Sequence, residues 1–163
     1  MPSPTAIDLL NQVLVMLRKS FPQYARYSRP YIPPGHEEAW RMLKDIATAE
    51  ESLAHQVNDE ILSMGGLTHA GDFAIDFTDT HDLGIDYMIA EAIGYQRQDI
   101  TKLETIIESL RSTPSAHAVV EEILNVAKRH LKTLEDLHAK PGSSMSFGTN
   151  GATPTDAPAS ATS

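Results

Sequence analysis

The sequence predicts an all-α protein that folds as a four-helix bundle with one long crossover between the second and third helices. Apolar residues recur three and four positions apart in four segments, which is the spacing of one face of a helix. The connections between these segments are short, long and short, and no segment shows the alternation of a half-buried strand. Helical bundles use this connectivity. We therefore expect one helical domain over residues 1–138 and a separate tail over residues 139–163.

The first helix is expected to begin after Thr5, which can cap the helix that follows. Pro22 has no N–H to donate, so this helix ends or kinks near Ser20 and resumes at most to Tyr27. The proline-rich connector over residues 29–35 is expected to be stiff. The apolar face of the first helix consists of Ile7, Leu10, Leu14 and Leu17.

The second helix is expected over residues 36–64. Gly65 and Gly66 end it, as glycine commonly does at a helix C-terminus. The long crossover then occupies residues 67–80 and finishes in residues that cap helices well. The inward face of the second helix consists of Leu43, Ile46, Glu50, Leu53, Val57, Ile61 and Met64.

The third helix is expected over residues 81–110 and the fourth over residues 115–138, with Pro114 suited to the first turn of the latter. The tail is rich in Ser, Thr, Gly, Ala and Pro and has almost nothing to bury, so we expect it to be disordered. The inward faces of the two helices consist of Asp86, Ile89, Ile93, Gln96, Ile100, Leu103 and Ile107, and of Val120, Ile123, Ala127, His130, Leu134 and Leu137.

Composition narrows the classes of function. The 163 residues contain no cysteine, which excludes disulfides, thiolate metal sites and cysteine nucleophiles. The net charge of −9 argues against a nucleic-acid partner held by phosphate contacts. No apolar run approaches the roughly 20 residues of a membrane span, so no membrane partner is expected. The first residues lack the basic start and apolar core of a signal peptide, and we expect a cytoplasmic protein.

Three ionisable residues interrupt the inward faces. Glu50 lies on the second helix, Asp86 on the third and His130 on the fourth. A charged group that is buried needs a hydrogen-bonded partner or a metal ion. These three residues are therefore the candidate functional site, either as a metal-free triad or as metal ligands.

Short stretches of these helices resemble the bacterioferritin and rubrerythrin side of the ferritin-like superfamily. Pro22-Gln23-Tyr24 is similar to the family's Asn-Gln-Tyr, and Asp82-Leu-Gly-Ile-Asp86 to its Asp-Leu-x-Leu-Glu. The likeness extends over residues 5–138 through the order of the helices. It implies a ferritin-like bundle, in which two helices each give one Glu and two each give a Glu-x-x-His pair to two metal ions.

The resemblance implies that three of these six ligand positions keep an ionisable residue. Glu50 would be the carboxylate of the second helix, Asp86 that of the third, and His130 the histidine of the fourth. The other positions carry Leu17, Leu53 and Ala127. A degenerate di-metal site of this kind is not expected to support ferroxidase activity. A link to iron or oxidative-stress physiology is implied by the resemblance alone.

Three interpretations stay open. The protein binds metal at most weakly and keeps Glu50, Asp86 and His130 as a hydrogen-bonded triad, or these residues hold one Fe, Mn or Zn ion. The third interpretation is a metal-free module for helix interaction or dimerisation. No haem is expected, because Glu51 stands where the resemblance places a haem-ligating Met. The tail does not resemble the helix that closes ferritin cages, so a dimer is favoured over a cage.

Other polar residues have simpler explanations. Gln96 lies on an apolar face, and the sequence does not identify its partner. The aspartates of the crossover, Asp72 and Asp76 among them, lack the central Gly and terminal Glu of an EF-hand calcium loop, so capping and solvation account for them better. Glu51 and His55 fit a pair on a solvated helix surface.

Overall fold

A computed structural model describes residues 4–80 and 84–139. Within these residues the chain forms helices and no strand, which confirms the all-α class. The expected tail lies outside the described residues, apart from Ala139, which ends the last helix. The elements are α1 (Ala6–Arg18), α2 (Phe21–Ser28), α3 (Glu37–Ser63), the 3-10 helix η1 (Ile75–Thr80), α4 (Ile85–Ser109) and α5 (Pro114–Ala139).

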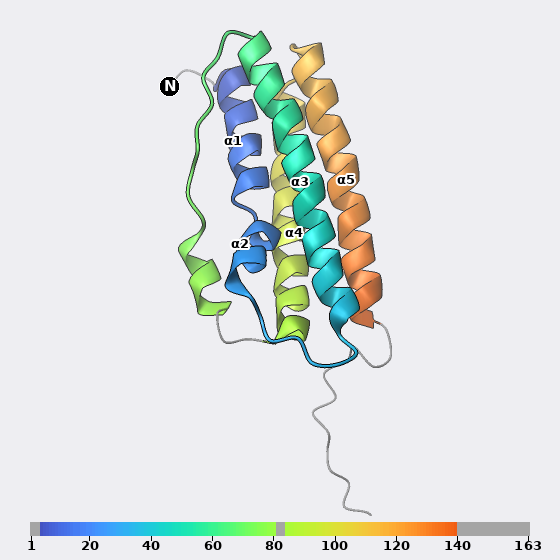
Figure 1. Ribbon diagram of the computed structural model, residues 1–163. Coiled ribbons are helices and arrows are strands. Elements are labelled where there is room, and N and C mark those ends of the chain that lie inside the picture. The colour runs from blue at the N-terminus through green and yellow to red at the C-terminus, as the bar shows by residue number, and fades with distance from the viewer. Residues whose placement is uncertain (1–3, 81–83, 140–163) are drawn as a thin grey trace, which may run out of the picture.

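The helices pack as a four-helix arrangement in which α1 and α2 together form the first member (Figure 1). In the view of Figure 1, α1 and α5 run downward while α3 and α4 run upward. Because α3 and α4 are parallel, the chain between them must return along the length of the bundle. Residues 64–80 are the described part of this return, so the long connection lies between the second and third long helices, as the sequence predicts.

The break between α1 and α2 occurs where the sequence places it. The Thr5 side chain and Asp8 form a capping box at the start of α1. Ser20 then caps α2, because its hydroxyl oxygen accepts a hydrogen bond from the Gln23 N–H at 3.3 Å. Pro22 sits in the first turn of α2, where a missing N–H costs nothing.

The crossover is fastened directly to α1. The Asn11 side-chain amide donates to the Leu67 carbonyl and its oxygen accepts from the His69 N–H, both at 2.9 Å. Gly71 has a φ of +64°, and a Cβ at this position would lie 2.5 Å from Cγ1 of Val15. Only glycine allows the crossover backbone to pass so close to α1 in this conformation.

Aromatic packing fastens the lower end of the crossover. The ring of Phe77, in η1, is buried and meets the rings of Phe21 and Tyr95 at centroid distances of 5.4 and 4.9 Å. Tyr24 and Phe73 extend the same group of rings. The crossover is therefore held at both ends by contacts with α1, α2 and α4.

The buried apolar side chains form two clusters, one above the other along the bundle. The upper cluster contains residues of α1, the second half of α3 and α4, and the first half of α5. The lower cluster contains residues of α2, the first half of α3 and α4, η1 and the end of α5. The level at which one cluster gives way to the other is where the candidate site lies.

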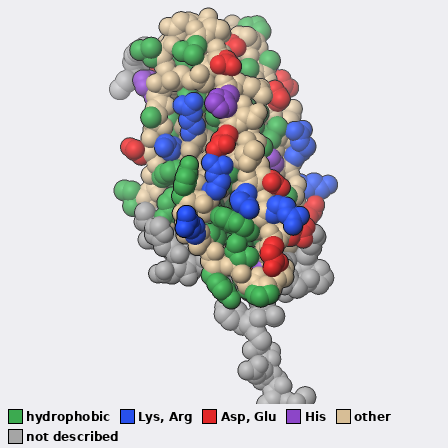
Figure 2. Space-filling model, viewed as in Figure 1, with side chains coloured by type: hydrophobic (Ala, Val, Ile, Leu, Met, Phe, Trp, Pro, Cys, Tyr) green, Lys and Arg blue, Asp and Glu red, His purple; other side chains and the backbone are tan. Residues whose placement is uncertain are grey.

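The visible surface carries charges of both signs. Lys and Arg side chains are interspersed with Asp and Glu over the face drawn in Figure 2. None of the helices in the described part of the chain is long and apolar enough to cross a lipid bilayer.

Candidate functional site

A layer of polar residues separates the two apolar clusters. Every member of the bundle contributes to it at the same level, between the upper and lower clusters. On α3, for example, Glu50 lies between Ile46 of the lower cluster and Leu53 of the upper cluster. We call this set the polar layer. It consists of Ser20 and Gln23 at the α1–α2 break, Glu50 from α3, Gln96 and Asp99 from α4, and His130 from α5.

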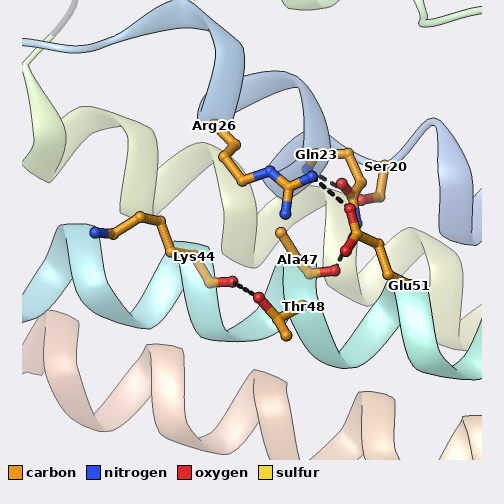
Figure 3. Close-up of polar contacts among 7 residues, drawn as sticks. All are labelled: Ser20, Gln23, Arg26, Lys44, Ala47, Thr48 and Glu51. Carbon is orange, nitrogen blue, oxygen red and sulfur yellow. Dashed lines mark hydrogen bonds and ion pairs between the residues drawn. The ribbon is translucent and has the colours of Figure 1, made fainter.

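Two buried amides tie the helices together within the layer. Gln23 donates from its side chain to the Ala47 carbonyl of α3 at 2.6 Å (Figure 3). Gln96 donates to the Ala127 carbonyl of α5 at 3.1 Å. A backbone carbonyl inside a helix can accept a second hydrogen bond because its oxygen has two lone pairs. The partner of Gln96 that the sequence did not identify is thus a backbone group.

An ion pair covers the layer on its α2–α3 side. The Arg26 guanidinium donates to the Glu51 carboxylate, which raises the pKa of Arg26 (Figure 3). Both side chains are partly exposed, so this pair contributes little by itself, on the order of 0.2–1 kcal/mol. Glu51 therefore belongs to a surface contact with α2.

Glu50 is the most constrained ionisable group in the layer. Its side chain is only 6% exposed, and the Ser20 hydroxyl hydrogen-bonds its carboxyl group. The Oε1 atom has no hydrogen-bond partner among the described residues. Burial raises the pKa of Glu50 well above 4.5, and the charge of Asp99 adds to this effect while Ser20 opposes it. The protonated form of Glu50 is therefore favoured.

Asp99 and His130 are also pushed toward their uncharged forms. Burial raises the pKa of Asp99 to about 6, although the nearby charge of Lys102 works in the opposite direction. Burial lowers the pKa of His130, with a further contribution from the charge of Arg129. Glu50 and His130 therefore favour their uncharged forms, whereas Asp99, with a pKa of about 6, is mostly ionised at neutral pH.

A small cavity of about 20 Å³ lies in the layer. Glu50, Gln96, Asp99 and His130 line its polar side. A cavity of this size holds one water molecule when two or more polar groups face it. Its apolar lining includes the three residues that the resemblance placed at ligand positions, Leu17, Leu53 and Ala127.

The structure does not bring Asp86 to this cavity, which corrects the predicted site. Asp86 lies in the first turn of α4, and its Oδ1 is 2.9 Å from Nδ1 of His36. Asp99, the acid of α4 that faces Glu50, is 13 residues further along, roughly 20 Å at about 1.5 Å per residue. The proposed triad of Glu50, Asp86 and His130 is therefore not assembled.

Sequence reasoning missed Asp99 although a signal was present. Asp99 follows Gln96 by three residues and precedes Leu103 by four, so all three lie on one helical face. The run of polar residues from Gln96 to Asp99 resembles a solvated surface, and this conceals the inward position. In the described ranges, no three His, Asp or Glu side chains form a group that could hold a metal ion.

Searches with protein-family models, curated proteins and solved structures found no match to this chain.

Proposed function

We propose that this protein is a ferritin-like bundle in which a polar layer around a protonated Glu50 takes the place of a di-metal site, so that it binds metal at most weakly and is not a ferroxidase. Two features of the fold support the proposal. The parallel helices α3 and α4 are joined by a long crossover, which is ferritin-like connectivity. The polar layer also draws on every bundle member, as an interior metal site would.

One observation carries the proposal: Glu50 is buried beside a second acid, Asp99, and neither has a cationic partner within the layer that would keep it ionised. Metal ions need deprotonated carboxylates, so binding one here would require ionising Glu50, whose pKa is raised well above 4.5 by burial. Leu17, Leu53 and Ala127, on the same cavity, supply no ligand atoms. The burial of Glu50 favours retention of its proton over binding of a metal ion.

The polar layer then serves the fold itself. Its amides and carboxyl groups must meet partners across helices, which sets the register of α2 on α3 and of α4 on α5. A bundle of this kind can act as an interaction module, and we propose a cytoplasmic homodimer as its working form. A role in iron or oxidative-stress physiology is part of the same proposal and rests on the resemblance.

Elemental analysis after metal loading tests the proposal. Untagged protein is incubated anaerobically with Fe(II), desalted and measured beside Glu50→Gln and Glu122→Gln, the latter removing an exposed acid of α5. We expect far less than one ion per chain, with equal values in all three proteins. One iron per chain in the wild type and Glu122→Gln but none in Glu50→Gln would overturn the proposal.

A further inference from the structure

A large groove lies on the other side of the polar layer, between α1, the crossover and α4. Its volume is about 900 Å³, which is at the upper end of the range of small-molecule sites. Asp99 lines this groove as well as the small cavity, so it stands on the wall between them. Met16 of α1 occupies a similar position on the apolar side.

The groove is preformed because the crossover is fastened at both ends. Asn11 holds its upper part through Leu67 and His69, and the Phe77 ring holds its lower part. Gly71 lies against Val15 between these points. Binding of a ligand would therefore not carry the entropy cost of ordering the crossover, and preorganisation of that kind favours affinity.

The charged groups on the groove are mainly acidic. Asp72 and Asp76 come from the crossover and Asp99 from α4, while Asp8 lies in the α1 capping box. The basic groups are Lys19, His69 and Lys102, and the charge of Lys102 lies near enough to Asp99 to oppose the rise in its pKa. The Lys19 ammonium lies over the ring of Phe73, a crossover residue, 4.8 Å from the ring centroid. Asp99 is the most deeply placed of the acids, so a cation that reaches it is removed from solvent.

The rest of the lining is apolar and aromatic. At the lower end the Tyr95 ring is partly exposed and stacks on the buried ring of Phe21, with centroids 5.3 Å apart, while Phe77 is buried behind them. Val15, Met16 and Ile106 cover the length of the groove between the helices. Aromatic faces attract cations as well as apolar groups, so they suit a ligand that combines both.

We propose that this groove binds a small organic cation with an aromatic or apolar body, its ammonium group beside Asp99 and its body against Val15, Met16 and Tyr95. Burying the ammonium beside a carboxylate gives a charge-assisted hydrogen bond that an uncharged analogue cannot form. The inference goes beyond the proposed function and does not depend on whether the interior binds metal.

Calorimetric titration of the full chain with 4-phenylbutylamine tests the inference, with 4-phenylbutan-1-ol and 4-phenylbutyrate as the uncharged and anionic analogues. We expect the amine to bind at least about tenfold more tightly than the alcohol, and the butyrate to bind more weakly still. Asp99→Asn should remove this preference, leaving the amine equal to the alcohol. Glu122→Gln, with the same change of charge on α5, should leave all three affinities unchanged.

A second pair of variants keeps the test independent of any effect of Asp99→Asn on folding. Thr105→Trp places a large ring on an exposed groove position of α4 and should abolish binding of the amine and the alcohol. Asp72→Asn combined with Asp76→Asn should weaken the amine alone, by about two- to threefold. Failure of the amine to bind, equal affinity for amine and alcohol in the wild type, or tighter binding of the butyrate would overturn the inference.

Discussion

Asp99 of α4 lies close enough to Glu50 of α3 for its negative charge to raise the pKa of Glu50. Ionising either acid therefore makes ionising the other less favourable, and the two titrate as a coupled pair. The imidazole of His130 lines the same cavity, and burial disfavours its charged form as well. At this level Glu50 and His130 thus favour their uncharged forms, and Asp99 carries a negative charge above a pH of about 6.

Replacing Asp99 with Asn should stabilise the protein in a pH-dependent way. The pKa of Asp99 rises from 3.8 to about 6 on folding, so the folded state holds more protons than the unfolded state between these values. The free energy of unfolding contributed by this group falls as pH rises through that window, and the full penalty applies above pH 6. Asp99→Asn should therefore add about 2–3 kcal/mol at pH 7.5 and almost nothing at pH 3.5.

Urea denaturation at the two pH values measures this difference, with Glu122→Gln as the control for loss of one surface charge. An equal effect of Asp99→Asn at both pH values, or a destabilisation at pH 7.5, would contradict the assignment of Asp99 to the buried layer.

Replacing Asp86 with Asn should cost little and should leave the layer unchanged. The pair between Asp86 and His36 lies at the lower end of the bundle, where both side chains are partly exposed. We expect a loss of about 0.5–1.5 kcal/mol in the free energy of unfolding. The pH dependence measured by comparing wild type with Asp99→Asn should be the same in an Asp86→Asn background. A change in that pH dependence would mean that Asp86 interacts electrostatically with the polar layer.

Replacing Asn11 with Ala should loosen the upper part of the crossover. The substitution removes both hydrogen bonds that tie Leu67 and His69 to α1, and it leaves backbone groups in a partly buried place without partners. A loss of about 1–3 kcal/mol is expected. Amide hydrogen exchange at His69 should become faster, while amides in the middle of α3 change only through the global loss of stability. Gln12→Ala, at an exposed neighbouring position, is the control. Unchanged exchange at His69 would refute the fastening role of Asn11.

Much of this architecture follows from the sequence because the helical spacing of apolar residues is strong over long segments. The pattern shows the break before Pro22, the end of α3 ahead of Gly65, and the inward positions of Glu50 and His130. The predicted start of the third helix at residue 81 falls outside the described residues, and α4 itself begins at Ile85.

The third member of the site escaped prediction for a physical reason. Asp86 lies on the same helical face as the apolar residues of α4, but it is at the helix end, where solvent and His36 satisfy it. Asp99 lies among polar residues and is only partly exposed, because it faces the cavity that Met16 of α1 and Glu50 of α3 also line. The partner of Gln96 is the backbone carbonyl of Ala127, and because every residue has such a group, the sequence cannot identify it as the partner.

The protonation of Glu50 is the central claim, and a carbon-13 NMR titration of its side-chain carboxyl group tests it most directly. The signal can be assigned by its disappearance in Glu50→Gln. The account predicts a pKa well above 4.5, and a lower value in Asp99→Asn, where the neighbouring negative charge is gone. A Glu50 carboxyl that titrates near 4.5 and does not respond to Asp99→Asn would contradict it.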